Sequence, residues 1–274
     1  MIHCYLSGDP VHDLVLRAFY DGCPEQKELR SVRNYEPSDV AVVFGTWKQA
    51  IEFSKYRGWI IKEQTEQKKP VVIIDSGYIK RGMGEHDYYA CGLGGLNGRA
   101  DFRNHHSPAD RFEALKVEIR PWREAGDVIL LCGQVPWDAS VDFTDHQAWL
   151  EDAVERIKAN TERPIVFRPH PKAKIATPKG CTIRSKDGLG EDLARAWAVV
   201  TFNSNAGVDA ALAGIPVFVD DIGSMAYAVA NRNLIHLDDP QMPDRSKWAA
   251  NLAYCQWTPK EMREGRTWKH LFAS

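Results

Sequence analysis

The sequence contains neither a Cys-x-x-Cys nor an Asp-x-Asp motif, and it has no long run of apolar residues. The wide spacing of its six cysteines argues against a disulfide scaffold or a zinc site, so we expect buried free thiols in a reducing compartment. No stretch reaches the roughly 18 apolar residues that span a membrane, and the first residues lack the basic and apolar regions of a signal peptide. We therefore expect a cytoplasmic protein without a transmembrane segment.

A strong excess of one charge is also missing. The net charge is −2 at pH 7, so the chain has no overall basic field to bind nucleic acid, although a local basic groove stays compatible with it. The 274 residues are 44% hydrophobic and 26% charged, which is typical of a soluble globular protein. This length allows one large domain or two domains of roughly 130 residues, each with a sizeable core.

Short apolar strands alternate with helical stretches along the chain, and this alternation indicates α/β domains with parallel sheets covered on both faces. The first half predicts strands at 2–6, 39–44 and 71–74, with helices at 11–20 and 47–66. A glycine-rich segment, 82–99, follows no clear strand and is interpreted as a loop. The second half predicts strands at 128–132, 165–167, 181–184, 199–202, 217–219 and 235–237, and helices at 146–160, 190–198, 206–213, 224–231, 245–254 and 259–270.

The alternation restarts at 128–132, after Gly126, which predicts a domain boundary near 120–126. We expect a first α/β domain over 1–123 and a second over 124–256. The last residues, 257–274, are expected to form a helix that packs back on the first domain.

Residues 199–219 form a βαβ pattern, with a strand, a polar turn, a helix of small residues and a second strand. Ser204 and Asn205 are candidate helix N-caps, Gly214 ends the helix, and Pro216 forbids its continuation. Backbone N–H groups and a hydroxyl at a helix N-terminus suit a phosphate or another anion. Taken alone, the turn is better explained as an ordinary cap.

A second signal follows the strand at 165–167, which ends in Arg168-Pro169-His170-Pro171. In open α/β sheets, ligands lie beyond the carboxyl ends of the strands. His170 and Ser204 are therefore expected to face the same ligand. A rigid turn alone explains the first motif, but the two motifs together favour a ligand site.

At these residues the chain resembles the capsule polysaccharide biosynthesis proteins, which include glycosyltransferases that use CMP-Kdo and have the two-domain GT-B fold. The resemblance rests on residues 130–135 (LLCGQV) with Asp138 and Ser140, on the Arg-Pro-His-Pro motif, and on residues 203–217. Residues 74–79 (IDSGYI) are similar to the acidic-x-Gly-aromatic segment of that family.

The resemblance implies a GT-B-like fold of two Rossmann-like parallel-sheet domains facing a cleft. It also implies that the second domain holds the nucleotide phosphates of a sugar donor. Asp209 stands where the family usually has Glu, which leaves its contact with a ribose hydroxyl open. The donor-binding residues expected on this basis are Gln134, Arg168, His170, Asn203, Ser204, Asn205, Gly207 and Asp209.

Asp75 is the candidate catalytic carboxylate, because it follows a buried strand and could take a proton from an acceptor hydroxyl. The alternative is that Asp75 caps the turn that it makes with Ser76 and Gly77. Asp9 is a second candidate, with a stronger alternative role as a turn former. Gly77, Tyr78 and Arg81 are expected on the acceptor side, and no residue is expected to bind a metal.

These residues predict a metal-independent glycosyltransferase that moves a sugar from a nucleotide-sugar co-substrate to a hydroxyl acceptor, here a glycan, without a further cofactor. A phage-type enzyme that glycosylates a hydroxymethylated base in DNA is one alternative. A sugar-nucleotide epimerase and a non-catalytic nucleotide-sugar-binding module are others. Basic residues near the glycine-rich segment suit the DNA alternative, although a solvated loop also explains them: Lys80, Arg81, Arg99, Arg103 and Arg111.

Overall fold

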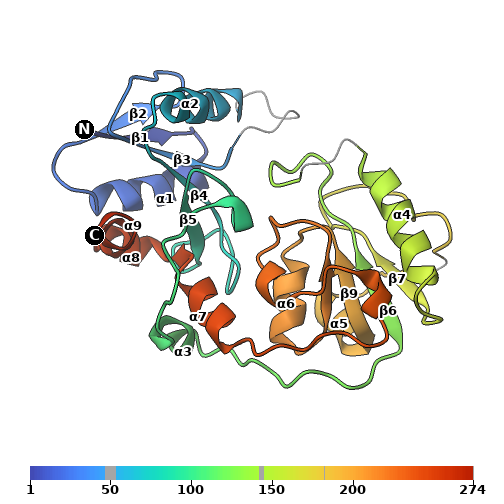
Figure 1. Ribbon diagram of the computed structural model, residues 1–274. Coiled ribbons are helices and arrows are strands. Elements are labelled where there is room, and N and C mark those ends of the chain that lie inside the picture. The colour runs from blue at the N-terminus through green and yellow to red at the C-terminus, as the bar shows by residue number, and fades with distance from the viewer. Residues whose placement is uncertain (47–53, 142–144, 182, 274) are drawn as a thin grey trace. The chain divides into compact units, whose positions relative to one another are not determined.

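The computed structural model describes residues 1–46, 54–141, 145–181 and 183–273. The chain has a mixed α/β fold with two sheets, and it divides into two compact units (Figure 1). Unit 1 comprises Met1–Phe112 and Ala249–Ser274, and unit 2 comprises Glu113–Trp248. The boundary predicted near 120–126 lies inside unit 2, whereas residues 249–256, predicted for the second domain, belong to unit 1. The cleft that the resemblance implies stays a prediction.

The sheet of unit 1 has the strand order β11-β5-β4-β3-β1-β2. The four strands β2, β1, β3 and β4 are parallel, as predicted, and β5 and β11 are antiparallel to their neighbours. Its strands are β1 (Ile2–Leu6), β2 (Lys27–Ser31), β3 (Val40–Phe44), β4 (Val71–Ser76), β5 (Tyr89–Leu93) and β11 (Gln256–Trp257). Its helices include α1 (Pro10–Asp21), α2 (Ser54–Glu66), α8 (Pro259–Arg263) and α9 (Arg266–Phe272).

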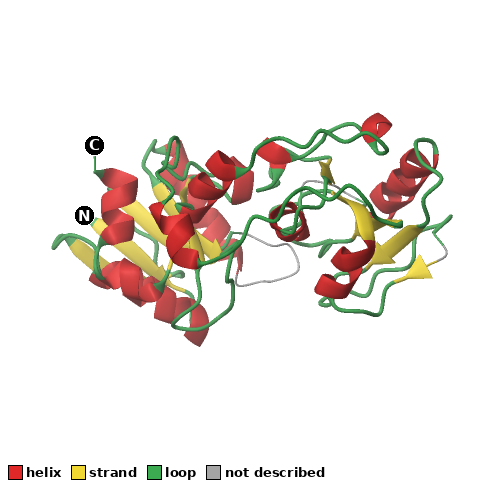
Figure 2. Ribbon diagram, turned by 90° about the horizontal axis from the view of Figure 1, so that it is seen from below, coloured by secondary structure: helices red, strands yellow, loops and turns green. Residues whose placement is uncertain are grey.

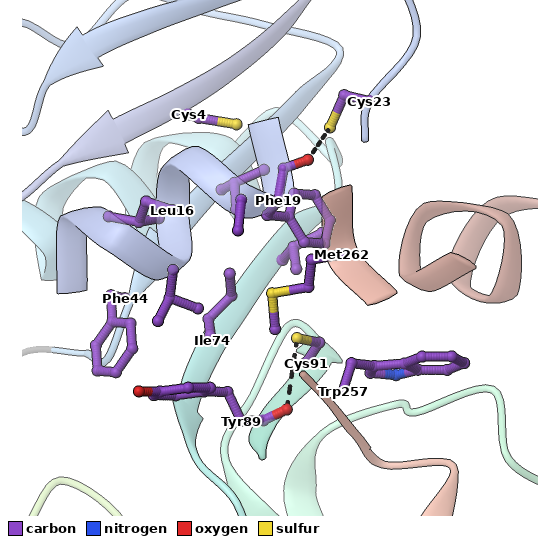
Figure 3. Close-up of a cluster of buried hydrophobic side chains, with 14 of the residues drawn as sticks. Cys4, Leu16, Phe19, Cys23, Phe44, Ile74, Tyr89, Cys91, Trp257 and Met262 are labelled. Atoms are coloured by element: carbon purple, nitrogen blue, oxygen red, sulfur yellow. Dashed lines mark hydrogen bonds between the residues drawn. The ribbon is translucent and has the colours of Figure 1, made fainter. Parts of the chain in front are cut away.

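The C-terminal segment is part of the core of unit 1. Met262, Trp257 and Leu271 are buried in one hydrophobic cluster with Phe19 of α1 and Ile74 of β4 (Figure 3). In Figure 1 the red helix α8 lies beside α1, which agrees with their contacts. Burial of these large apolar side chains joins the two ends of the chain in one folded unit.

The sheet of unit 2 is entirely parallel, with the order β10-β9-β6-β7-β8. Figure 2 shows helices flanking the strands of each unit. From β6 the chain continues to β7 and β8 on one side, and it then returns to β9 and β10 on the other. The elements are β6 (Val128–Cys132), α4 (His146–Lys158), β7 (Ile165–Arg168), β8 (Ile183–Arg184), α5 (Leu189–Arg195), β9 (Ala196–Thr201), α6 (Ala206–Leu212) and β10 (Val217–Val219).

Helices α3 (Asp110–Leu115) and α7 (Ser246–Ala253) lie where the chain passes between the units. The helix predicted over 47–66 is described from Ser54 onward as α2, and its residues 47–53 lie outside the described residues. The strand predicted at 181–184 corresponds to β8, and its residue 182 lies outside the described residues. Within the described ranges, no helix is both long and apolar enough to cross a membrane.

Several predicted elements differ from the structure for local reasons. The strand predicted at 235–237 is wrong, because Leu234–His236 is a 3-10 helix in which Asn233 accepts a hydrogen bond from the Ile235 amide at 3.1 Å. The helix predicted over 224–231 contains only the 3-10 turn Tyr227–Val229. The helix predicted over 259–270 is broken into α8 and α9 at Gly265, whose φ is +73°.

The loop interpretation of the glycine-rich segment is also wrong in part, because β5 runs through it. At Gly92 an added Cβ would lie 2.7 Å from the Ala100 Cβ and 2.8 Å from the Phe102 ring. A glycine is therefore needed in this strand for close packing of the following chain.

Candidate functional site

Unit 2 has a topological switch point between β6 and β9. The strands β7 and β8 follow β6 on one side, and the later strands β9 and β10 are added on the other side. Ligands of open α/β sheets bind beyond the carboxyl ends of the strands at such a point. Gln134 follows β6, and Asn203 follows β9. The Arg168–His170 segment begins at the last residue of β7, the other neighbour of β6. The parallel sheet thus brings three of the predicted donor-binding segments to one edge.

Gln134 and Asn203 hold each other across the switch point, and both side chains are buried. The Gln134 amide donates to Asn203 Oδ1 at 2.6 Å, and the Asn203 backbone N–H donates to Gln134 Oε1 at 2.7 Å. Asn203 Nδ2 also donates to the Ser140 carbonyl at 2.7 Å and to Asp221 Oδ2 at 2.6 Å. These bonds fix the loops after β6, β9 and β10 relative to one another.

His170 is half-buried just beyond β7. Its Nδ1 accepts a hydrogen bond from the Lys172 backbone N–H at 3.1 Å, which places the proton of the neutral ring on Nε2. Burial is the main cause that lowers the pKa of His170; the charges of Lys172 and Arg168 lower it further, against the opposing effect of Asp138. The ring is therefore neutral at pH 7 and offers one N–H donor from Nε2.

Arg168 is bound within unit 2. Its guanidinium donates to Asp192 Oδ2 at 2.6 Å and to the Asp187 carbonyl at 2.7 Å. The buried Asp192 carboxylate also accepts from Ser185 Oγ at 2.6 Å and from Arg195 at 3.1 Å. Arg168 thus fixes the start of the His-Pro segment, while its contact with a donor stays a prediction.

The turn before α6 contains the two residues that the sequence offers as candidate N-caps. Asn205 precedes the helix, and Ser204 Oγ accepts a hydrogen bond from the Ala206 backbone N–H at 3.3 Å. Gly207 lies where α6 packs on the sheet, since an added Cβ would meet a Val217 methyl carbon at 3.3 Å. Both contacts are structural, and phosphate binding by these residues stays a prediction.

Asp209 lies in the first turn of α6. Its side chain is partly exposed, and its charge acts on Cys132 at the end of β6. Asp209 is therefore near the same edge of the sheet, and the predicted contact with a ribose hydroxyl is untested.

Unit 1 has its own switch point, between β1 and β3. Asp9 follows β1 and caps α1, because its Oδ1 accepts from the backbone N–H groups of Val11 at 2.9 Å and His12 at 3.1 Å. The hydrogen bond from the His12 amide is the main cause that lowers the pKa of Asp9. The structural role given as the alternative for Asp9 is thus present, and its catalytic role stays a prediction.

Asp75 is the last residue but one of β4 and is partly exposed. Its Oδ1 accepts a hydrogen bond from the Ser76 backbone N–H at 2.7 Å. At Gly77 the chain passes close to Tyr88. An added Cβ would lie 2.3 Å from the Tyr88 carbonyl oxygen, which accepts a hydrogen bond from the Gly77 amide at 3.0 Å. A glycine is required here by the close approach of two chain segments.

Tyr78 is buried, and burial raises its pKa well above the ordinary value. Its hydroxyl donates to Asn97 Oδ1 at 3.2 Å, and its carbonyl accepts from Arg81 at 3.1 Å. Sequence reasoning missed Gln256 of β11, whose Oε1 accepts the backbone N–H groups of Tyr78 at 2.8 Å and Ile79 at 2.9 Å. Gln256 holds the loop after Asp75, and a lone glutamine 178 residues downstream of Tyr78 gave no signal for that role.

No group of three or more His, Cys, Asp or Glu side chains is arranged to hold a metal ion in the part of the chain that the structure describes. The expectation that transfer needs no metal stays a prediction.

The architecture has counterparts among solved structures. A β-Kdo 2,4 transferase, KpsC of Thermosulfurimonas dismutans, matches with a TM-score of 0.59 and 12% identity over 92% of this chain and 89% of that chain. The fold resembles that of Kdo transferases. A β-Kdo 2,7 transferase, KpsC of the same organism, matches with a TM-score of 0.54 and 13% identity over 96% of this chain and 97% of that chain. No family model and no curated protein sequence matches the chain. At this identity the likeness establishes the fold, which agrees with the predicted GT-B-like class.

Proposed function

We propose that this chain is a glycosyltransferase that moves a sugar from a nucleotide-sugar donor to a hydroxyl group of a glycan. The observation that carries the proposal is the gathering of Gln134, His170 and Asn203 at the carboxyl ends of three adjacent parallel strands in unit 2. Similarity to two Kdo transferases over more than nine-tenths of the chain supports it. Those two proteins make CMP-Kdo and a Kdo-terminated acceptor the first substrates to test.

Unit 2 would bind the nucleotide part of the donor. The neutral His170 ring offers its Nε2–H to a phosphate oxygen, and this bond strengthens as the leaving phosphate gains charge. Ser204 adds a hydroxyl beyond the end of β9, on the other side of β6 from β7. The Gln134–Asn203 pair keeps the loops after β6 and β9 in place, so this part of the site needs little rearrangement when the donor binds.

Unit 1 would supply the group that activates the acceptor. Asp75 takes the proton of the acceptor hydroxyl as its oxygen bonds to the anomeric carbon of the sugar. The bond between that carbon and the phosphate oxygen breaks, and its electron pair leaves with the nucleotide. Metal independence is part of the proposal, so excess EDTA should leave the rate of transfer unchanged.

Donor binding is tested by thermal unfolding in the presence of CMP, UDP and GDP and their sugars, because a ligand that binds only the native state raises its stability. With the nucleotide that gives the largest shift, His170→Ala should weaken binding by about 1–3 kcal/mol in calorimetry. His236→Ala is the matched control, because His236 is an exposed histidine of the same unit. Equal affinity of wild type and His170→Ala would exclude the phosphate contact.

The reaction is tested by nucleotide release from CMP-Kdo with and without a synthetic Kdo glycoside as acceptor. A transferase releases CMP and lengthens the acceptor only when both substrates are present. Acceptor-independent conversion of the sugar nucleotide would identify an epimerase instead. Binding without any turnover would identify a non-catalytic binding module.

A further inference from the structure

At the switch point of unit 1, the side chain of Arg57 contacts the end of β3. Arg57 belongs to the first turns of α2, and its Nη1 donates to the carbonyl oxygen of Phe44, the last residue of β3. At the next residue, Gly45, an added Cβ would lie 3.1 Å from the same nitrogen. The guanidinium therefore lies directly against the backbone where β3 ends.

Asp75 lies beside this position on the adjacent strand. Phe44 pairs with Ile74 in the β3–β4 register, and the Gly45 amide donates to the Ile74 carbonyl at 2.7 Å. Gly45 and Asp75 are therefore neighbours across strands that are about 4.8 Å apart. A guanidinium placed against Gly45 is within direct electrostatic reach of the Asp75 carboxylate.

Asp9 approaches from the other side of β3. The first turn of α1, which Asp9 caps, contacts this strand through the ring of His12, which stacks on the ring of Phe44 with a centroid distance of 4.0 Å. Burial lowers the pKa of the Arg57 guanidinium, and the negative charges of Asp75 and then Asp9 oppose that effect. Among the described residues, the titratable side chains that act on this sheet edge include Asp9, His12 and Tyr78.

We propose that Arg57 is the positioning residue for Asp75, holding its carboxylate charged and oriented at the end of β4. The inference rests on the proposed function, in which Asp75 takes the acceptor proton. Two carboxylates at one sheet edge repel each other, and the repulsion favours protonation of one of them. A guanidinium between them offsets this repulsion, so the Asp75 carboxylate can be held in place while Asp9 continues to cap α1.

A double-mutant cycle on turnover tests whether Arg57 acts through Asp75. Arg57→Gln should lower kcat about 10–100-fold, since misplacing a catalytic group by about 1 Å has an effect of this size, and nucleotide affinity should stay unchanged. In the Asp75→Asn background, the same substitution should have almost no further effect. Fully additive effects in the cycle would overturn the proposal.

Two further variants separate charge from folding. Arg57→Lys keeps the positive charge and should restore a large part of the turnover lost in Arg57→Gln; equal loss in both would count against the proposal. Lys62→Gln is the matched control, because Lys62 lies on the same helix in an exposed pair with Glu66, and it should leave kcat unchanged. Circular dichroism at the assay temperature establishes that each variant is folded.

A measurement without substrate keeps this inference separate from the proposed function. In a carbon-detected NMR titration of the aspartate side chains, Arg57→Gln should raise the pKa of Asp9, because the guanidinium charge helps to lower it. An unchanged Asp9 titration would show that Arg57 does not act on this sheet edge. If the Asp9 titration shifts but the wild-type protein transfers no sugar, the action of Arg57 on this sheet edge is supported and the proposed function is wrong.

Discussion

The guanidinium of Arg168 and the carboxylate of Asp192 form an ion pair with an N–O distance of 2.6 Å. The pair connects the last residue of β7 to helix α5, and the Asp192 side chain is completely buried. The segment that carries His170 therefore starts from a residue whose position is fixed by charge and hydrogen bonding as well as by its strand.

Removing this arginine should destabilise unit 2. Arg168→Ala leaves the buried Asp192 with only Ser185 and Arg195 as side-chain partners among the bonds described, and it should lower the free energy of unfolding by about 1.5–3 kcal/mol. Urea denaturation measures the change. Arg195→Ala removes a more exposed arginine from the same carboxylate and should cost less. A larger loss in Arg195→Ala would contradict this account of the cluster.

Acid should weaken the loop after β6. His146 Nε2 accepts a hydrogen bond from the Gln134 backbone N–H at 3.1 Å, and burial lowers the pKa of His146 to about 4. The unfolded chain, with a histidine pKa near 6.5, binds the proton more readily, so the stability present above pH 6.5 is lost as the pH falls toward 4. The loss should be about 1–3 kcal/mol, the cost of leaving a buried donor without its acceptor.

Urea unfolding of wild type and His146→Gln at pH 7, 5.5 and 4.5 isolates this effect, because other groups titrate in both proteins. The stability difference between them should shrink as the pH falls. A difference that stays constant over this range would show that His146 does not titrate there.

Gly77 should not tolerate a side chain. In Gly77→Ala the new methyl group meets the Tyr88 carbonyl oxygen, and we expect the free energy of unfolding to fall by about 1–3 kcal/mol. Gly190→Ala is the control, since a Cβ on this exposed residue of α5 meets no atom within 4 Å. It should be neutral or stabilising by about 0.4–1 kcal/mol. Thermal unfolding compares the two variants, and equal melting temperatures would argue against the close approach.

Asp75→Asn separates the catalytic role from the structural one. The asparagine Oδ1 can still accept the Ser76 amide, so the loop should be kept, whereas the negative charge is lost. Loss of a general base should lower turnover roughly 10²–10⁴-fold and leave donor affinity nearly unchanged. Steady-state kinetics with CMP-Kdo and a Kdo glycoside provide the measurement. Asp101→Asn, an exposed aspartate of the same unit, should keep full activity. Full activity in Asp75→Asn would make Asp75 a turn residue only.

The sequence predicts those parts of the fold in which one short segment carries its own signal. The apolar strands β3 and β6 and the βαβ pattern around α6 agree with the structure, because buried parallel strands are apolar throughout and their caps lie within a few residues. Strand β9 begins at Ala196, whereas the sequence predicts a helix over 190–198 and a strand only from residue 199. Strand β2 is polar because it lies at the sheet edge, and its sequence, KELRS, has no such signal. Strand β5 lies in the glycine-rich segment, so its sequence has no continuous apolar run that would indicate a strand.

For the candidate site, the sequence predicts the residues that follow strands but not the partners that hold them. His170 and the turn at Ser204 were identified because they follow strands directly, and the strand order brings them to one edge. The partners that hold these residues are distant in sequence and belong to common types. Asp192 resembles any acidic residue in a first helical turn, and Arg57 resembles any basic residue on a polar helix face. Only the fold shows which charges they meet.

Unit 1 is interrupted in sequence, since residues 113–248 form unit 2 and the chain then returns to add Trp257, Met262 and Leu271 to its core. During synthesis on the ribosome, unit 2 is complete before unit 1 has its last core residues. The expected order of folding is therefore second unit first, with the first unit waiting for the end of translation. A premature stop that removes only the last twenty residues would release a chain whose middle is folded and whose beginning is not.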